Sequence, residues 1–190
     1  MTNVLIHMCC GPCATYTVEH WRGERLEVVG LSFNPNIHPY TEHQQRLESL
    51  KAFAKSAELP LFVPPGYDMV GFLRRVVGRE GDRCVECFRM RLSLTASEAQ
   101  EKGFDAFSTT LLISPHQKHS LLKEVGEAVA AEHKIRFLYA DLRPGFSESR
   151  RMTKDLGLYR QQYCGCIYSE WERYAQLTIP ADDSCLPPGK

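Results

Sequence analysis

The chain has 190 residues, of which 43% are hydrophobic, and its 23 basic and 23 acidic side chains give a formal net charge of zero. This length and composition predict one globular domain with a real hydrophobic core. The balanced charge excludes a protein that coats nucleic acid indiscriminately, but it allows a local basic face that binds one RNA.

No segment approaches the roughly 20 apolar residues that span a membrane, and residue 1 is not followed by a secretory signal pattern. We therefore expect a cytoplasmic protein without a membrane partner. Structural disulfides are rare in that compartment, so the eight cysteines call for a metal or redox explanation.

Predicted strands and helices alternate along the chain. The strands are expected at residues 3–8, 26–33, 61–63, 105–110 and 136–140. The helices are expected at residues 13–21, 68–77, 84–102, 119–133, from about 147 and at 169–176. A further helix of about 16 residues is expected after Thr41, which would cap it in a capping box with Gln44.

This alternation is typical of a Rossmann-like, three-layer α/β fold with a mostly parallel sheet of about five strands. We expect one domain over residues 1–178 and a loose, proline-rich tail over 179–190. The unusual loops at 9–13, 34–40, 111–117 and 141–146 each follow a predicted strand. They should converge at the carboxyl ends of the strands, where such sheets bind ligands.

Seven cysteines lie in three tight groups. The groups are Cys9, Cys10 and Cys13; Cys84 and Cys87; and Cys164 and Cys166. Four sulfurs from separate groups can hold a zinc ion or an iron–sulfur cluster, and seven exceed what one structural zinc requires. The CGPC stretch alone also matches a thioredoxin dithiol. The spacing of the cysteines therefore does not decide between an iron–sulfur cluster, a zinc site and a redox dithiol.

The pair Cys164-Gly165-Cys166 has two interpretations. A disulfide across one glycine closes a small, strained ring that is easily reduced, which suits a redox pair. The same two thiols would also serve as metal ligands. Cys185, in the expected tail, receives no role.

Weaker candidates surround the expected rim. His7 lies in the first strand and is a core residue or a neighbour of the site, while Asn36 and His38 lie in a rim loop that could touch substrate. His116, His119 and Asp141 also follow strands and are equally explained as loop caps. A basic set consists of Arg46, Arg89, Arg91, Lys118, Arg143, Arg150, Arg151 and Lys154. Tyr40, Tyr159, Tyr163 and Tyr168 would either stack on an RNA base or pack internally.

Five motifs occur in a fixed order: HMCCGPC, NPNIHPYTEHQQR, RCVECFRMR, TTLLISPHQKH and LYRQQYCGCIYS. Together, over about residues 4–174, they resemble the epoxyqueuosine reductases of the QueH family. Many relatives have alanine where this chain has Gly11, and this difference is not expected to change the chemistry.

The resemblance implies a nucleotide-α-hydrolase-like fold and an oxidoreductase that converts epoxyqueuosine to queuosine at the tRNA wobble position, without cobalamin. It implies a [4Fe–4S] cluster on Cys9, Cys10, Cys84 and Cys87 and a redox-active pair at Cys164 and Cys166. An additional mononuclear iron is associated with the family, and Cys13 with the CGC pair would be its ligands.

The partners implied are tRNAs with GUN anticodons, for Asp, Asn, His and Tyr, and an unidentified electron donor, but no DNA. Asn36, His38, Arg143 and Tyr163 are the expected substrate contacts. Asp141, His38 or a tyrosine would donate protons.

Two other classes remain. One is a zinc-binding RNA module without catalysis. The other is an ATP-using tRNA sulfur-transfer enzyme, which places a Gly/Ser-rich phosphate loop after the first strand. Residues 9–13 occupy that position with one glycine and no serine, which argues against ATP activation.

Overall fold

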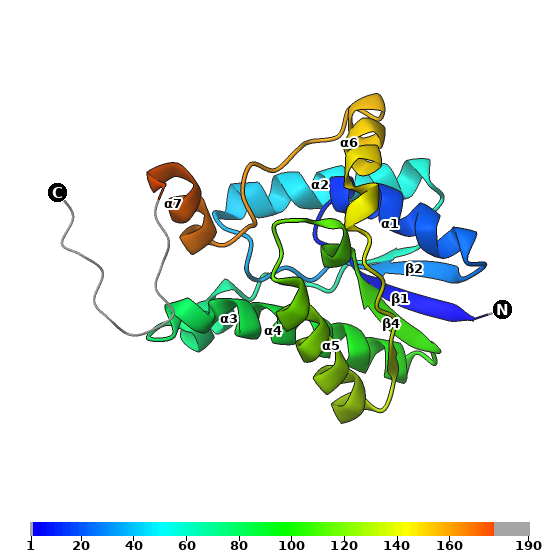
Figure 1. The fold of residues 1–190 in the computed structure, drawn as a ribbon, viewed down its shortest axis with the longest axis horizontal. Helices are drawn as coiled ribbons and strands as arrows, with labels where there is room; N and C mark the ends of the chain where they lie inside the picture. The colour runs from blue at the N-terminus through cyan, green and yellow to red at the C-terminus, as the bar shows by residue number, and fades with distance from the viewer. Residues whose placement is uncertain (1, 177–190) are drawn as a thin grey trace.

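The computed structural model describes residues 2–176, which are built around one sheet of five parallel strands (Figure 1). The strands are β1 (Asn3–His7), β2 (Glu27–Leu31), β3 (Leu61–Phe62), β4 (Ala106–Thr109) and β5 (Arg136–Phe137). Their order is β3-β2-β1-β4-β5, and every neighbouring pair is parallel. The predicted α/β fold class is confirmed.

Helices cover both faces of the sheet (Figure 1). One face carries α1 (Gly11–Gly23), α2 (Tyr40–Ser56) and α6 (Phe146–Asp155), and the other carries α4 (Arg83–Glu101) and α5 (His119–His133). α3 (Met69–Val76) packs on α4, and α7 (Ile167–Ala175) lies at the end of the molecule opposite the amino ends of the strands. Short 3-10 turns lie at η1 (Glu80–Asp82), η2 (Thr110–Ile113) and η3 (Arg143–Gly145).

Most predicted elements appear within two residues of their expected bounds, and two differ in an instructive way. α2 begins at Tyr40, with Pro39 as the residue before it, so Thr41 lies inside the helix and caps nothing. The rings of Tyr40 and His43 stack across that first turn, which favours the earlier start. β5 ends at Phe137, because the chain leaves the sheet edge after Leu138 donates to the carbonyl of Phe107.

The central strand β1 is buried on both faces, as expected of a parallel sheet. Leu5 packs with Phe107 of β4 in a core cluster beneath α4 and α5, whereas Val4 and Ile6 pack in a second cluster beneath α1 and α2. The alternation of side chains along one strand thus supplies both halves of the core.

The strand order reverses between β1 and β4. The chain proceeds from β1 outward through β2 and β3, then returns to place β4 on the other side of β1. Ligands of open α/β sheets bind at this topological switch point, outside the carboxyl ends of the strands. Residues that follow β1 and β4, beginning with Met8 and Thr110 and including Cys9, therefore occupy the binding position of the fold.

Gly11 begins α1 where that helix touches α2. A Cβ atom at Gly11 would lie 2.6 Å from the carbonyl oxygen of Ser49. We expect Gly11→Ala to lower the free energy of unfolding by about 1–3 kcal/mol, because the backbones must separate. Urea unfolding checks this, with Gly23→Ala as the control, because no atom lies within 4 Å of a Cβ at Gly23. Equal stabilities for the two variants would contradict the prediction.

Two sequence expectations lie beyond the described residues: the domain boundary at 178 with its tail, and Cys185. Within residues 2–176, no helix is both long and apolar enough to cross a membrane.

Candidate metal centre

Cys9, Cys10 and Cys13 form a buried cluster at the carboxyl end of β1, here called the thiol triad. Their three Sγ atoms lie within 4.8 Å of one another, and the Sγ atoms of Cys9 and Cys10 are 3.6 Å apart. Cys9 and Cys10 continue the extended chain from β1, and Cys13 lies in the first turn of α1, three residues after Cys10. The strand-to-helix turn thereby brings three soft sulfur ligands together.

Burial and mutual hydrogen bonds shift the pKa values of the three triad cysteines in different directions. Hydrogen bonds from the Cys10 and Cys13 thiols, with a further bond from Thr110, hold the pKa of Cys9 well below its usual value despite burial. The pKa of Cys13 is raised, because its hydrogen bonds to Cys10 and Cys9 and its burial all favour the thiol. The lowered pKa favours the thiolate form at Cys9, and the thiolate is the form of cysteine that binds metals.

A second group of cysteines lies where α4 and α7 begin. Cys84 and Cys87 occupy the first turn of α4, and Cys166 precedes α7. Cys87 and Cys166 are buried in one cluster. Burial is the main cause of the raised pKa of Cys87, and the charges of Cys164 and Cys166 raise it further. Cys84 packs against the core cluster of which the thiol triad is part, but among the described residues only Cys9, Cys10 and Cys13 form a group close enough to share one metal ion.

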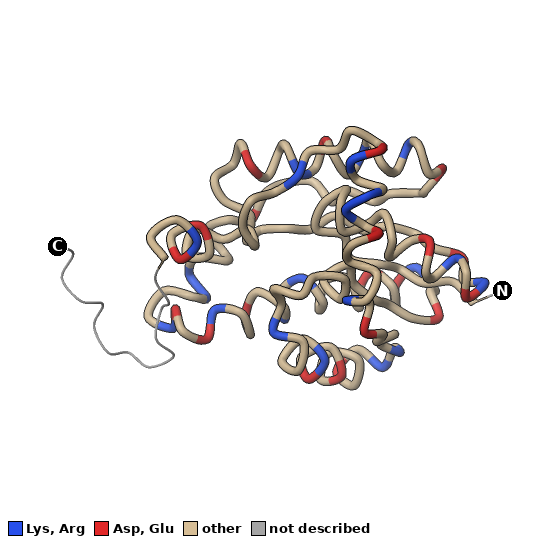
Figure 2. The backbone as a smooth tube through the Cα atoms, turned by 45° about the horizontal axis from the view of Figure 1, so that its top comes forward, with Lys and Arg blue, Asp and Glu red and all other residues tan. Residues whose placement is uncertain are grey.

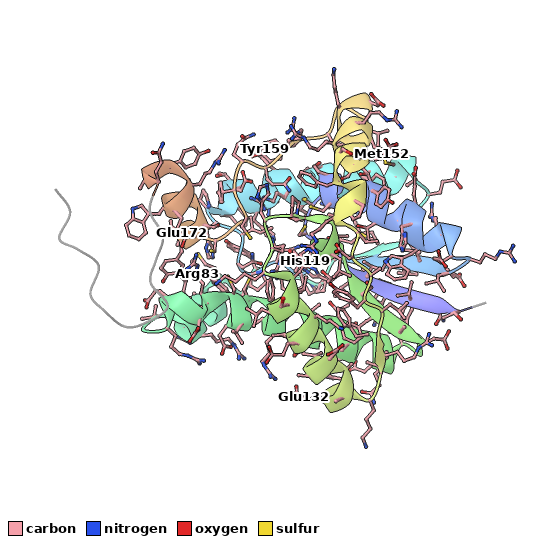
Figure 3. The ribbon with its side chains drawn as sticks, viewed as in Figure 1. Arg83, His119, Glu132, Met152, Tyr159 and Glu172 are labelled. Carbon is pink, nitrogen blue, oxygen red and sulfur yellow. The ribbon has the colours of Figure 1, made fainter. Side chains whose placement is uncertain are left out.

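An ion pair holds α4 and α7 together beside these cysteines. The Nη2 of Arg83 lies 2.5 Å from the Oε2 of Glu172, and Figure 3 shows the two side chains meeting between the helices. Arg83 immediately precedes Cys84 in the chain. The pair thus keeps the Cys84–Cys87 turn close to Cys166.

Five of the cysteine sulfurs accept a hydrogen bond, three of them from a distant part of the chain and two from the same helix. Thr110 Oγ1 donates to Cys9 (3.4 Å), Gln161 Nε2 to Cys13 (3.6 Å), Arg91 Nη2 to Cys87 (3.0 Å), Gln117 Nε2 to Cys164 (3.3 Å) and Ser169 N to Cys166 (3.4 Å). Such bonds stabilise thiolates and tune the potentials of iron–sulfur sites. The sequence motifs contained these donors, but spacing alone gave no signal for them.

The CGC loop is held over the site by Arg46 of α2. Its guanidinium donates to the carbonyls of Cys164 (2.8 Å) and Tyr163 (3.0 Å) and pairs with Glu42 at 2.7 Å. It also lies near enough to Cys10 for its charge to lower the pKa of that thiol, although burial and the bond to Cys9 raise it overall. Arg46 is 1% exposed, so this expected rim residue is internal.

The rim loop at 34–38 clamps the same CGC loop. His38 N donates to the carbonyl of Gly165 at 2.8 Å, and His38 Nδ1 accepts from Ile167 N at 3.3 Å. Tyr163 donates its hydroxyl to the carbonyl of His38. Gly165 has a φ of 151°, and a Cβ there would lie 3.2 Å from Asn36 Nδ2. Asn36, His38 and Tyr163 are therefore brought together around the CGC loop.

Arg143, the fourth expected substrate contact, lies apart from this clamp. It is exposed and bound to Asp141, and that hydrogen bond lowers the pKa of Asp141 to about 2. Asp141 is then ionised at neutral pH and is unsuited to donate a proton. Burial raises the pKa of Tyr159 to about 12, so this hydroxyl keeps its proton at neutral pH.

The expected basic set does not form one face. Arg46 and Arg91 are buried, while Arg89 and Arg151 are bound to carboxylates. Figure 2 shows basic and acidic positions interspersed along the tube. His7 is a core residue: it is buried between Thr109 and Asn34, and burial lowers its pKa to about 3.

Fold and site together define a Rossmann-type α/β protein with a buried cysteine cluster, able to hold metal, at its switch point. The chain belongs to the epoxyqueuosine reductase QueH family, whose model matches residues 4–172. The fold is also similar to a predicted subunit of tRNA methyltransferase from Methanocaldococcus jannaschii. That likeness has a TM-score of 0.54 at 10% identity, covers 81% of this chain and 75% of the other, and concerns the fold alone.

Curated relatives named epoxyqueuosine reductase QueH align over nearly the whole chain. The protein of Dehalococcoides mccartyi is 44% identical over 94% of this chain and 98% of its own length. Those of Streptococcus pyogenes and Thermotoga maritima are 35% and 33% identical, over 88% and 91% of this chain and 70% and 93% of theirs.

Proposed function

We propose that this chain reduces epoxyqueuosine to queuosine at the wobble position of tRNAs with GUN anticodons. The observation that carries the proposal is the buried thiol triad at the switch point, in a chain that belongs to this reductase family. The tRNAs would be those for Asp, Asn, His and Tyr, and an electron donor would renew the enzyme after each turnover.

The donor set fits an iron–sulfur cofactor. Clustered, buried cysteine sulfurs select soft metals and iron–sulfur clusters over hard cations. Cys9, Cys10, Cys84 and Cys87 would hold a [4Fe–4S] cluster, and Cys164 with Cys166 would act either as a redox pair or, together with Cys13, as ligands of an additional iron. When bound, these groups would supply single electrons and a Lewis acid for the epoxide oxygen.

If the CGC pair is the redox partner, its dithiol would supply both electrons and both protons of the reduction. Removal of the epoxide oxygen as water consumes two electrons and two protons and leaves a carbon–carbon double bond. Oxidation of the Cys164 and Cys166 dithiol to a disulfide releases the same number of each. Cys164 is exposed, so an external donor could reduce that disulfide for the next cycle.

The residues that surround the CGC loop, Asn36, His38 and Tyr163, would position that loop and the substrate. Asn36 Oδ1 is buried and has no hydrogen-bond partner among the described residues, so a substrate hydroxyl would reach it only when the covering CGC loop moves. Tyr163 and His38 would hold Cys164 and Cys166 against the cofactor. Asp141 is the least suited of the expected proton donors, because its hydrogen bond to Arg143 lowers its pKa and favours the carboxylate, so His38 or a tyrosine would donate the proton.

Metal analysis with an activity assay tests the proposal. Protein purified without oxygen should be brown, contain about four irons and four sulfides per chain, and reduce epoxyqueuosine in tRNA when given a low-potential donor. Iron above four would indicate the additional site. Colourless protein with one zinc and no iron would contradict the proposal and favour a zinc-binding RNA module.

Two variants separate the roles of the cysteines. Cys166→Ser is expected to retain the cluster but to lose turnover, because no disulfide can form. Cys87→Ala should lose cluster and turnover together, because a ligand is missing. Visible spectra and single-turnover reduction measure both effects. Turnover retained by Cys166→Ser would remove the redox role of the CGC pair.

A further inference from the structure

A second cavity opens on the same rim, at the carboxyl end of β2. This cleft has a volume of about 350 Å³ and is lined by residues of the loop after β2, the first turns of α2 and the segment 63–68. The seven described cysteines are absent from its lining. The proposed reduction therefore leaves the cleft without a role.

Three rings form one wall of the cleft. The ring centroids of His43 and Tyr67 are 4.5 Å apart, those of Tyr40 and Tyr67 are 5.5 Å apart, and Tyr40 stacks on His43 at 6.2 Å. Tyr40 is nevertheless 56% exposed, so one ring of a packed group remains open to a ligand. Pro35, Pro64 and Pro65 add stiff, apolar surfaces to the lining.

The charge of the lining favours a neutral ligand over a phosphate. Among residues 2–176, no lysine or arginine lines the cleft, and burial lowers the pKa of His43, which favours its neutral form. The carboxylate of Asp68 is engaged as the cap of α3, where it accepts from Gly71 N at 2.9 Å. The amide of Gln44 offers a hydrogen-bond donor and an acceptor beside the rings.

The cleft lies one strand away from the thiol triad. Asn34, in the cleft lining, donates to the carbonyl of Met8 at 2.9 Å, immediately before Cys9. Tyr67 donates to the carbonyl of Ile37, and His38 in the same loop holds Gly165. The loop 34–38 thus separates the cleft from the CGC loop, with one site on each side.

We propose that this cleft binds a second, unpaired nucleobase of the substrate RNA, stacked on Tyr40, while the modified nucleotide lies over the cysteines. The inference rests on the proposed function, which requires a single-stranded anticodon loop. Proteins commonly bind such loops by stacking splayed bases on aromatic side chains. In a GUN anticodon the base next to the wobble position is uracil, whose edge offers a donor and acceptors that match the amide of Gln44.

Equilibrium binding and crosslinking test the cleft. An anticodon stem-loop RNA with 5-iodouridine after the wobble position is irradiated on the protein, and the crosslinked peptide is mapped by mass spectrometry. We expect the crosslink at Tyr40, His43 or Tyr67. Tyr40→Ala should weaken RNA binding roughly tenfold, whereas Tyr40→Phe, which keeps the ring, should bind like the unsubstituted protein. Tyr174→Ala, at an exposed ring of α7 outside the cleft lining, is the control.

Each outcome decides the proposal. A crosslink outside the cleft, equal affinities for Tyr40→Ala and Tyr174→Ala, or no RNA binding at all would overturn it. Binding is measured without reductant, so it does not depend on turnover. If the RNA crosslinks in the cleft but is never reduced, the proposed function is wrong and the cleft proposal stands. If the RNA is reduced and Tyr40→Ala binds it as tightly as the unsubstituted protein, the cleft proposal is wrong and the proposed function stands.

Discussion

Cys10→Ser is expected to leave the protein without its metal and without activity. Cys10 lies in the thiol triad, next to Cys9 and near enough to Arg46 to be affected by its charge. Serine keeps the size of the side chain but replaces a soft sulfur ligand with a hard, protonated hydroxyl. Loss of an outer-shell partner already lowers metal affinity about 10–100-fold, so loss of a ligand should remove bound iron altogether.

The control must separate loss of a ligand from loss of stability. Val18→Ala removes buried methyl groups from the core cluster beneath α1 and α2, and the thiol triad belongs to the other cluster. We expect this variant to lose about 1–3 kcal/mol of unfolding free energy but to keep its iron. Iron and acid-labile sulfide per chain are measured for both variants. Iron retained by Cys10→Ser would contradict the assignment of the triad.

Cys13→Ser refines the same experiment. The sequence motifs associate Cys13 with the CGC pair, whereas the structure brings its sulfur within 4.8 Å of both Cys9 and Cys10. Spacing explains this, because Cys10 and Cys13 are three residues apart and a helix places such residues on one face. If Cys13 holds the additional iron, its substitution should lower the iron count while four sulfides remain.

The sequence was sufficient for the sheet and for the cysteines that follow β1. β1 is a continuous apolar run, and parallel strands that are buried on both faces have this pattern. The position of Cys9 at the switch point then follows from the order of strands and helices. These features are local, or they depend on rules of connection that hold for most α/β sheets.

The surroundings of the cysteines could not be predicted in the same way. Arg46 and Arg91 appear in the sequence as members of a basic rim, yet both are buried. The buried guanidinium of Arg46 donates hydrogen bonds to the carbonyls of Tyr163 and Cys164, which lie more than a hundred residues away in the chain. Arginine is rarely buried unless its guanidinium has hydrogen-bond partners. A single sequence does not reveal which distant carbonyls will be those partners, so the burial of Arg46 could not be predicted.

Arg46→Ala is expected to lower the free energy of unfolding by about 3–5 kcal/mol, the usual cost of breaking a buried ion pair. The substitution leaves the carboxylate of Glu42 buried beside Tyr159 and removes the donors to two carbonyls of the CGC loop. Arg46→Lys restores the charge but not the planar fork that reaches Glu42 and both carbonyls, so its stability should be intermediate. Urea unfolding gives the three values.

Thiol reactivity should show the consequence for the CGC loop. Without Arg46 the carbonyls of Tyr163 and Cys164 lose their donors, so Cys164 should be alkylated by iodoacetamide faster than in the unsubstituted protein. Arg151→Ala is the matched control, because Arg151 is exposed and its pairs with Glu148 and Asp155 should contribute less than about 1 kcal/mol. If Arg46→Ala unfolds and reacts like Arg151→Ala, the buried arginine does not hold the loop. If it reacts faster and also loses turnover with its iron intact, the position of the CGC loop rather than the cofactor limits the reaction.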